Sequence, residues 1–482
     1  MSLSGALSNA LSGLFANARG TSVLSANIAN ALNEGYGRRE VVLTTDVNQS
    51  SGGVRVAQVT RQSDPILAYQ KRLAAADFSA SSAFAAFDAK FEQLVGSVDT
   101  LGSIADKLTR METALLSAAS DPSSETRLKT VSFAAEGFVS ALREASDGLT
   151  TQRSRADQQI ATAVRTLNSG LSQLEGLNKQ IMTAKHLGQD SLGLMDQRDT
   201  VLDQLSEFVP LHVVERDSGV IAVFTAQGRT LLDERAVELS FDATPMVLPH
   251  MNTSNGLVSR LQINGQAVDV PGSAMMNGGA LAAQFALRDT IVPEAQARLD
   301  GVAREAIHRF GSGGPDTTLG PGDAGVFTDN GLAFVPTNEI GLAGRITLNN
   351  ALSSSNSEPW RWRDGINATA QGDAGNATLL SALRTQITRP IAAGSAALGS
   401  GDQSLIGYVQ NLSSDAAANR VRSFDARNYA SAHLDSVRQS VASDGVNTDQ
   451  ELQKLIELEK SYAANARVVQ VVDDMLSELL RI

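Results

Sequence analysis

The sequence contains no cysteine. Disulfides, thiolate catalysis and cysteine-ligated metal sites are therefore excluded, and the composition says nothing about the redox state of the compartment. Histidine is also scarce, and the five histidines lie too far apart in the chain for a paired zinc motif such as H-E-x-x-H. They are His186, His212, His250, His308 and His433. We predict no metal site, since one would have to be assembled entirely by the fold.

Long hydrophobic runs are missing too. No stretch approaches the roughly 18 consecutive apolar residues of a membrane span, so we expect no membrane partner. The N-terminal residues do not resemble a secretory signal, because no Lys or Arg precedes Arg19 and polar residues interrupt the apolar ones. If the protein is exported, we expect another route. The net charge of −12 argues against a nucleic-acid partner, which would require basic patches.

Common nucleotide and hydrolase motifs are absent. No Gly-Lys pair occurs, which excludes a Walker P-loop, and no G-x-S-x-G sequence is present. The segment GSGGPDTTLGPG (311–322) is predicted to be a flexible loop rather than a phosphate cradle, because it contains no lysine and no strong helix start follows it. We predict no catalytic residue, no cofactor and a protein that is not an enzyme.

Two other clusters have both a chemical and a structural interpretation. Trp360 and Trp362 fall on one face of a possible strand, where they would stack on sugars or, as we expect, pack in a core or interface. Asp196, Asp199 and Asp203 share one face of a predicted helix because of their i, i+3, i+7 spacing. We interpret these carboxylates as a solvated face.

The sequence does contain a repetitive segment at its beginning. Residues 2–30 include three Gly and eleven Ser, Thr or Asn, which together cost roughly 8 kcal/mol of helix propensity relative to alanine. Even so, a set of mostly apolar residues recurs at alternating intervals of three and four positions, as in the a/d seam of a heptad repeat. The seam is Leu7, Ala10, Leu14, Asn17, Thr21, Leu24, Ile28 and Ala31. Burial of its large apolar members could offset the loss, so we expect this helix to need a partner.

A second seam lies at the other end of the chain. Its members are Leu455, Leu458, Tyr462, Asn465, Val469, Val472, Leu476 and Leu479. Two interpretations fit the periodicity. Each segment is an ordinary amphipathic helix on its own domain, or the two segments pair as a coiled coil that joins both ends of the chain.

Between these segments, helical and strand periods alternate. RREVVLTTDV (38–47) and GGVRVAQVTR (52–61) predict a small hairpin around a loop at Ser50–Gly53. Asp64 and Pro65 predict a helix start, as N-cap and first helical residue, and the same device recurs at Asp121 and Pro122. From there to about Phe208 the chain reads as helical, with breaks near Gly148 and Gly188.

After Pro210 the period changes to two. Turns are predicted at 217–219 and at Asn264-Gly265, helix returns over 280–310, residues 326–376 are mixed, and helix resumes near Ala377. The predicted fold class is mainly α with an inserted β-rich module and terminal coiled-coil helices. We divide the chain into a terminal domain (1–45 with 441–482), a long-helix bundle (46–208 with 377–440, helix 280–310 packing on it) and an outer β-rich module (209–279 with 311–376).

Both ends resemble a known family. SGLFANARGTSVLSANIANALNEGYGRREVVL and DGVNTDQELQKLIELEKSYAANARVVQVVDDMLSELLRI are similar to the N- and C-terminal signatures of bacterial flagellar rod, hook and hook-associated proteins. Two interior segments, around MDQRDTVLDQL and over 278–310, are similar to hook-associated proteins of the hook–filament junction. The resemblance covers about residues 1–310 and 377–482. Gly37 and Arg39 depart from the Ser/Thr and Gln that the family often shows.

The resemblance implies a structural role at the hook–filament junction, with a rod or hook subunit, or a secreted adhesin or enzyme on the same frame, as alternatives. It implies export through the flagellar type III channel. The implied partners are further copies of the chain, the hook protein, hook-associated protein 3 and an export chaperone at the C-terminal helix. The expected assembly interface is Leu7, Leu14, Leu24, Ile28, Leu455, Leu458, Tyr462, Val469, Val472, Leu476 and Leu479.

Overall fold

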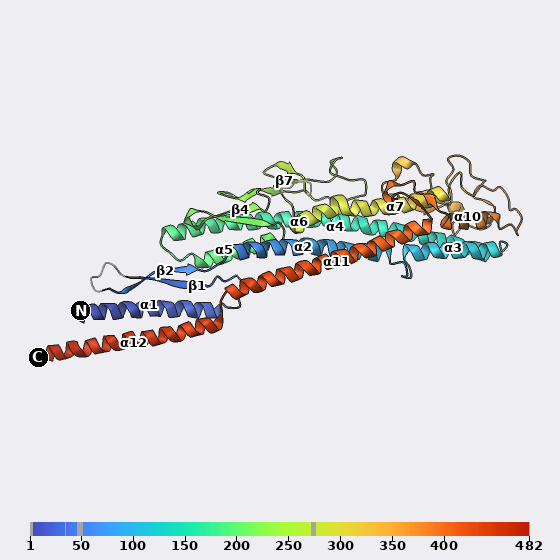
Figure 1. Cartoon of the computed structure of the whole chain (residues 1–482). Coiled ribbons are helices and arrows are strands. Elements are labelled where there is room, and N and C mark those ends of the chain that lie inside the picture. The colour runs from blue at the N-terminus through green and yellow to red at the C-terminus, as the bar shows by residue number, and fades with distance from the viewer. Residues whose placement is uncertain (1–2, 34, 46–51, 271–275, 482) are drawn as a thin grey trace. The chain divides into compact units, whose positions relative to one another are not determined.

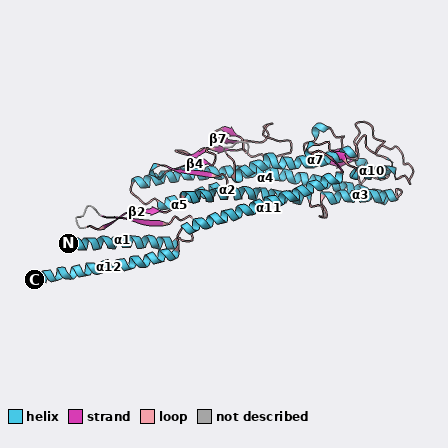
Figure 2. Cartoon of the chain, in the orientation of Figure 1, coloured by secondary structure: helices cyan, strands magenta, loops and turns pink. Residues whose placement is uncertain are grey.

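A computed structural model describes residues 3–33, 35–45, 52–270 and 276–481. The chain is mainly helical with short strands, which confirms the predicted fold class (Figure 2). The helices are α1 (Leu3–Ala29), α2 (Pro65–Val95), α3 (Ile104–Ser120), α4 (Glu125–His186), α5 (Leu192–Ser206), α6 (Gly279–Ala286), α7 (Val292–Arg309), α8 (Leu342–Arg345), α9 (Arg361–Asp364), α10 (Thr378–Thr388), α11 (Leu405–Asp444) and α12 (Thr448–Arg481).

The strands form five small antiparallel sheets within the described residues. They are β1 (Arg39–Thr45), β2 (Val54–Arg61), β3 (Leu211–Glu215), β4 (Ile221–Thr225), β5 (Thr230–Leu232), β6 (Leu239–Ser240), β7 (Leu261–Ile263), β8 (Gln266–Val268), β9 (Phe327–Asp329), β10 (Ile346–Leu348), β11 (Ile391–Ala392) and β12 (Asp402–Gln403). None of the helices in the described part of the chain is long and apolar enough to cross a membrane.

The chain forms two compact units. Unit 1 consists of Met1–Asp77, Thr166–Val237 and Ala430–Ile482, and unit 2 of Phe78–Arg165 and Glu238–Tyr429. Both terminal helices therefore belong to unit 1. The three-part division predicted from the sequence cuts the chain at other positions and remains a prediction.

The predicted hairpins of unit 1 are confirmed. β1 and β2 pair in antiparallel register with a bulge between Val42 and Leu43, and the loop predicted between them lies mostly outside the described residues. β3 and β4 are joined by a tight turn in which Ser218 has a φ of 67°. That left-handed conformation is uncommon for a residue other than glycine, and here it closes the predicted 217–219 turn.

One predicted helix start is confirmed and one is wrong. Asp64 accepts hydrogen bonds from the N–H groups of Ile66 and Leu67 at 2.7 and 3.3 Å, so it caps α2 as predicted. Asp121 does not start a helix. Its N–H donates to the carbonyl of Ala118 and closes α3, and α4 begins only at Glu125.

The predicted break at Gly148 is also wrong, because α4 continues through this residue. A Cβ at Gly148 would lie 2.4 Å from Cδ2 of Leu94, so the missing side chain lets Leu94 of α2 rest on the α4 backbone. Glycine here serves helix–helix contact rather than helix termination. Gly188, with a φ of 66°, does follow the end of α4 as predicted.

Unit 2 has one large core to which α3, α4, α7, α10 and α11 contribute. Its aromatic centre is Phe327, which packs edge-on against Phe138 and Phe310 with ring centroids 5.8 and 5.4 Å apart. Trp362 is fully buried and its Nε1 donates to Ser132 Oγ at 2.9 Å. Trp362 lies on α9 rather than on a strand, and Trp360 is also buried, so the preferred core interpretation is confirmed.

The predicted helix over 280–310 is confirmed as α6 and α7 joined by a π-helical turn at Leu287–Ile291. Pro293 lies at the start of α7 and has no N–H for the usual bond to the preceding turn. The wider turn carries the helix past this position without ending it. The predicted Asn264-Gly265 turn is confirmed between β7 and β8, with φ values of 50° and 77°.

Asp300 on α7 holds a neighbouring segment of unit 2. Its carboxylate accepts from the N–H groups of Gly341 and Ala343 at 2.7 and 2.8 Å, and from Gln296 Nε2 at 2.9 Å. Burial raises the pKa of Asp300 to about 6, against the opposing effect of these donors and of Arg345. The carboxyl group therefore fixes the start of α8 from inside the core.

This raised pKa predicts how stability depends on pH. A carboxyl group with a higher pKa in the folded state binds its proton more tightly there, so the free energy of unfolding increases as pH falls through 6 toward the unfolded value of 3.8. Between pH 7 and pH 5 we expect Asp300 to contribute a gain of about 1 kcal/mol for unit 2. Urea unfolding at both pH values measures it.

The variant that tests this assignment is Asp300→Asn. It has no titrating carboxyl group at this position, so its free energy of unfolding should lack the increase between pH 7 and pH 5. Asp425→Asn, at an exposed position of α11, is the control and should keep it. An equal change with pH in the parent protein and in Asp300→Asn would contradict the assignment.

Candidate functional site

The two terminal helices lie side by side in unit 1 and run antiparallel, so that the first turns of α1 lie beside the C-terminal part of α12 (Figure 1). Asn17 Nδ2 donates to Ser461 Oγ at 2.9 Å, and Asn27 Nδ2 donates to Glu451 Oε2 at 2.9 Å. In each facing pair the residue numbers add to 478, and the pairs are 27 with 451, 20 with 458, 17 with 461 and 13 with 465. The predicted pairing of the chain ends is thus present within one chain.

Glycines explain why α1 tolerates its low helix propensity. A Cβ at Gly13 would lie 2.6 Å from Asn465 Nδ2, and a Cβ at Gly20 would lie 2.7 Å from Leu458 Cδ1. Larger residues at these positions would push α12 away. The two helices approach closely because α1 has no side chain at the positions where a side chain of α12 lies. The same glycines lower the helix propensity of α1, so the close contact requires that loss.

The residues predicted for the assembly interface have different surroundings in the single chain. Buried members are Leu24 and Val472, half-buried members are Leu7, Leu14, Ile28, Leu455, Leu458 and Val469, and exposed members are Tyr462, Leu476 and Leu479. On α1, Gly13, Gly20 and Asn27, which contact α12, each lie one residue before a predicted seam position, whereas Asn17, a predicted seam residue, contacts Ser461 directly. Sequence reasoning counted only large apolar residues and therefore missed the glycines.

The last turns of α12 extend past α1. The register places Leu3, the first described residue of α1, opposite Met475, so the following residues of α12 have no facing position on the described part of α1. Leu476, Leu479 and Leu480 are accordingly exposed. An open apolar pocket of about 370 Å³ lies between the two helices. It is lined by Leu3 and Ala6 of α1 and by Val468, Val471 and Met475 of α12.

Asn27 is the polar centre of the pair. Its side chain is buried and uses its whole hydrogen-bonding capacity. Nδ2 donates to Arg39 O and to Glu451 Oε2, both at 2.9 Å, while Oδ1 accepts from Tyr36 Oη at 2.8 Å and from Arg39 N at 3.0 Å. We call these residues the Asn27 hub. It joins α1, the turn that follows it, β1 and α12.

Glu451 completes the hub from α12. Its carboxylate is fully buried and also accepts from Arg38 Nε at 2.8 Å. Glu451 lies in the first turn of α12, where the helix dipole favours a negative charge. Burial raises the pKa of Tyr36, and the carboxylates of Asp196 and Glu451 act in the same direction against Arg39. Tyr36 therefore keeps the proton that it donates to Asn27.

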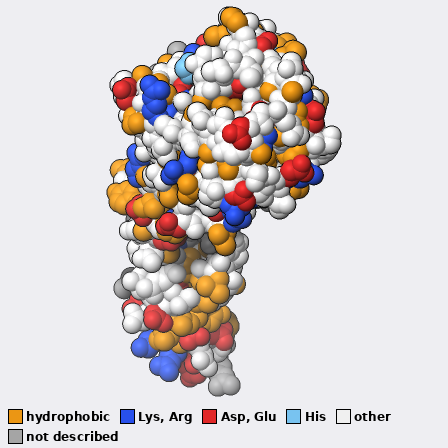
Figure 3. Space-filling model, turned by 90° about the vertical axis from the view of Figure 1, so that its right-hand side faces the viewer, with side chains coloured by type: hydrophobic (Ala, Val, Ile, Leu, Met, Phe, Trp, Pro, Cys, Tyr) orange, Lys and Arg blue, Asp and Glu red, His pale blue; other side chains and the backbone are white. Residues whose placement is uncertain are grey.

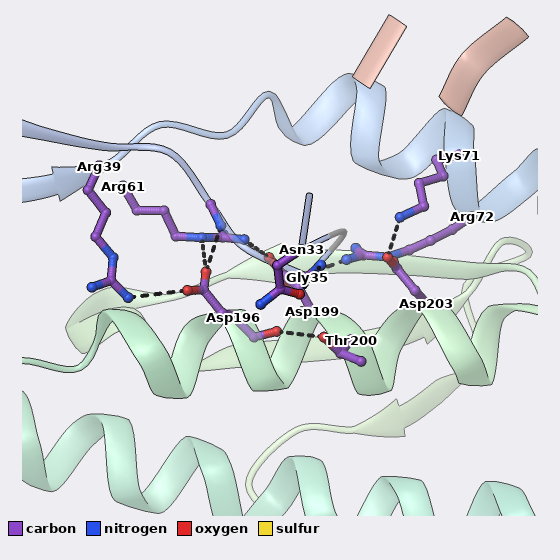
Figure 4. A network of polar contacts seen from close by, with 11 residues as sticks. Asn33, Gly35, Arg39, Arg61, Lys71, Arg72, Asp196, Asp199, Thr200 and Asp203 are labelled. Carbon is purple, nitrogen blue, oxygen red and sulfur yellow. Dashed lines mark hydrogen bonds and ion pairs between the residues drawn. The ribbon is translucent and has the colours of Figure 1, made fainter. Parts of the chain in front are cut away.

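A ladder of ion pairs joins α5 to β1, β2 and α2 (Figure 4). Asp196 pairs with Arg61 at 2.8 Å and Arg39 at 3.4 Å. Asp199 pairs with Arg61 at 2.7 Å and Arg72 at 3.3 Å. Asp203 pairs with Arg72 at 2.8 Å and Lys71 at 2.7 Å. We call these seven residues the α5 clamp.

The α5 clamp corrects the interpretation of the three aspartates as a solvated face. Their side chains are 14 to 30% exposed, and each binds two cationic groups. Isolated surface ion pairs contribute little, but a network is more favourable, and here Arg61 and Arg72 each bridge two aspartates. The basic partners come from segments far from α5 in sequence, and the sequence carried no signal that joined them.

The turn after α1 rests on the clamp through two glycines. Gly37 N donates to Asp196 Oδ1 at 3.0 Å, and a Cβ at Gly37 would lie 2.1 Å from Nε of Arg61. A Cβ at Gly35 would lie 2.6 Å from Thr200 Oγ1. Gly37 and Arg39, which depart from the common family residues, therefore act together here: one leaves room for Arg61 and the other pairs with Asp196.

The polar groups of the site hold segments of unit 1 together. Among the described residues, no group of three or more His, Asp or Glu is placed to hold a metal ion. The carboxylates of the clamp and of Glu451 are all engaged by Arg, Lys or Asn. Charges of both signs are also interspersed on the face drawn in Figure 3. The arrangement suits a joint between segments of unit 1.

We predict that Gly37→Ser weakens this joint. The new side chain would displace Arg61 from Asp196, and forced overpacking of this kind costs about 1–3 kcal/mol. Hydrogen exchange of amides in β2 and α5 should become faster. Gly193→Ser on α5 is the control, because a Cβ there meets nothing within 4 Å. Equal protection in both variants would show that Gly37 is not needed for the clamp.

Comparison with known proteins gives two family matches. Residues 89–312 match the model of the flagellar hook-associated protein FlgK helical domain. Residues 438–482 match the model of the flagellar basal body rod FlgEFG protein C-terminal. The second match covers all of α12 and the end of α11, and the first covers α3 to α7.

Two relatives that are both named flagellar hook-associated protein 1 match different shares of the chain. Flagellar hook-associated protein 1 of Bacillus subtilis is 25% identical over 497 residues, covering 94% of this chain and 93% of the relative. That of Salmonella typhimurium is 27% identical over 278 residues, covering 53% of this chain and 48% of the relative, so the match spans about half of that protein.

A solved structure, the flagellar hook junction protein FlgK from Burkholderia pseudomallei, matches 54% of this chain and 46% of its own at 23% identity and a TM-score of 0.42. The two family models and the Bacillus subtilis relative, which is matched over nearly its whole length, agree in pointing to flagellar axial proteins. The chain is thus similar to flagellar hook-associated protein 1 over nearly its whole length, and its residues 89–312 match the FlgK helical domain.

Proposed function

We propose that the protein is a structural component of the bacterial flagellum, the hook-associated protein that joins the hook to the filament. The observation that carries the proposal is the outward surface of the α1–α12 pair. Phe15 on α1 and Leu479 on α12 are 75% and 62% exposed. Large apolar side chains that are exposed on folded helices are typical of a surface that another protein covers.

The sequence of α1 supports this use of its outer face. Arg19 is the one charged residue between Leu3 and Ala29, and charged residues are depleted at the centre of protein interfaces. One set of exposed positions recurs every seven residues along α1 and into the turn that follows it. These positions are Ser4, Leu11, Ala18, Ser25 and Leu32. One face of α1 binds α12, and a second heptad face is available to a neighbouring subunit.

Contacts of this kind build an axial polymer. A neighbour that covers α1 of one subunit with a different surface of its own makes a head-to-tail contact, which repeats into an open helical assembly or a ring. The proposed partners are further copies of the chain, the hook protein on one side and hook-associated protein 3 on the other. The proposed location is the extracellular part of the flagellum, reached by type III export, and the role requires no chemical step.

An export chaperone is the proposed partner before assembly. Leu476, Leu479 and Leu480 extend past α1 and form an apolar stripe near the end of α12. A helix with anchors at this spacing suits a hydrophobic groove. Covering the stripe would prevent copies of the chain from associating before export.

We predict that Phe15→Asp and Leu479→Asp each abolish incorporation into the flagellum while the subunit stays folded. Both side chains are exposed in the single chain, so a carboxylate there is solvated until a neighbour would bury it. The measurement is filament attachment and swimming in a strain that lacks its own copy, together with thermal unfolding of the purified variant. Leu101→Asp, 81% exposed in unit 2, is the control. Normal motility with both terminal variants would refute the proposed interface.

We also predict that deletion of residues 452–482 abolishes chaperone binding, whereas deletion of residues 2–31 does not. The C-terminal segment carries the exposed leucines, while the N-terminal seam is interrupted by Asn17 and Thr21. Titration calorimetry of the two truncated chains against the chaperone measures this difference. Equal binding by both would show that the chaperone recognises another part of the chain.

A further inference from the structure

The shape of the α1–α12 contact does not specify a single register. Gly13 and Gly20 are seven residues apart on α1, and the two side chains that fill their places, Asn465 and Leu458, are seven residues apart on α12. Sliding α12 by one heptad would place Asn465 against Gly20 and Val472 against Gly13. The close approach at the glycines would be reproduced after a shift of about 10 Å along the helix axis.

The shifted register would bring exposed leucines at the end of α12 opposite α1. In the observed register Leu476, Leu479 and Leu480 lie past the first described residue of α1 and are exposed. After a shift by seven residues their facing positions fall between Gly5 and Asn9, inside α1. If hydrophobic contact alone chose the register, α12 would slide until these leucines were covered.

Polar contacts oppose that shift. In the shifted register Asn27 would face Leu458, and Glu451 would lie beyond Ala29, the last residue of α1. The buried amide of Asn27 would lose an acceptor and the buried carboxylate of Glu451 would lose a donor. A buried polar group that loses its partner without gaining water is strongly unfavourable.

We propose that the buried contact between Asn27 and Glu451 selects the register of the two terminal helices. Asn17 and Ser461 support the same register from a less buried position. The consequence is that a fixed set of leucines extends past α1. The inference concerns a single chain and holds whether or not the proposed junction role is correct. The competing determinant is the short connection Gly445–Asn447 between α11 and α12.

The absence of cysteine makes the register directly measurable in the full-length protein. The pair Asn17→Cys and Ser461→Cys reports the observed register, and the pair Asn17→Cys with Val468→Cys reports the register shifted by seven residues. In the parent background we expect the first pair to form its disulfide faster than the second. Asn27→Asp, which sets two carboxylates against each other, should shift the ratio of the two rates by on the order of tenfold toward the second pair.

Two further variants separate register selection from general damage. Adding Glu451→Gln to Asn27→Asp should restore the parent ratio, because the new amide can donate to the new carboxylate. Asn30→Asp is the matched control, since the Asn30 side chain donates to Ala26 of its own segment and should leave the ratio unchanged. Hydrogen exchange in unit 2 confirms that each variant is folded.

Three results would overturn the proposal. An unchanged ratio in Asn27→Asp would assign the register to the short connection and the glycine contacts. Loss of both disulfides would show that the contact docks the helices without choosing between registers. Equal rates for the two pairs in the parent background would show that the chain has no preferred register.

Discussion

The side-chain amide of Asn27 is the contact on which the arrangement of both chain ends depends. It binds α12 through Glu451, β1 through the backbone of Arg39, and the following turn through Tyr36. Because the amide is buried, movement of any one of these segments leaves an unpaired polar group inside the protein. The hub therefore couples helices that would be weak alone to a hairpin and turn that are fixed independently by the α5 clamp.

This coupling gives a physical meaning to the poor helix propensity of α1. Gly13 and Gly20 bring α12 close enough for Asn27 and Asn17 to reach it, and the same glycines make the isolated helix unfavourable. A chain end built in this way is ordered by its partner helix and, as we propose, further by neighbouring subunits. Order in the terminal segments would then be gained at assembly, when new apolar contacts are added.

Local signals in the sequence were sufficient for much of the fold. The hairpin turns at 217–219 and Asn264-Gly265 and the cap at Asp64 follow from periodicity and from residues next to one another, whereas periodicity left open whether the two chain ends pair. One error arose where a distant residue determines the local role, and the other where a local hydrogen bond ends the preceding helix. Gly148 continues its helix because Leu94 packs on it, and Asp121 closes α3 instead of opening α4.

The candidate site shows the same division. Periodicity located both terminal helices, but the residues that face α12 include glycines, which a search for apolar seams does not count. The aspartates of α5 were correctly placed on one face, yet their partners come from β1, β2 and α2. No spacing rule connects segments so far apart in the chain, and their proximity becomes visible only in the folded structure.

The most direct test of the account is an electron cryomicroscopy map of the hook–filament junction assembled from this chain, at a resolution that shows side chains. The account predicts that α1 and α12 of one subunit run antiparallel with Asn27 opposite Glu451, and that Phe15 and Leu479 contact neighbouring subunits. A map in which α12 packs on α1 in another register, or in which Phe15 and Leu479 face solvent, would contradict it.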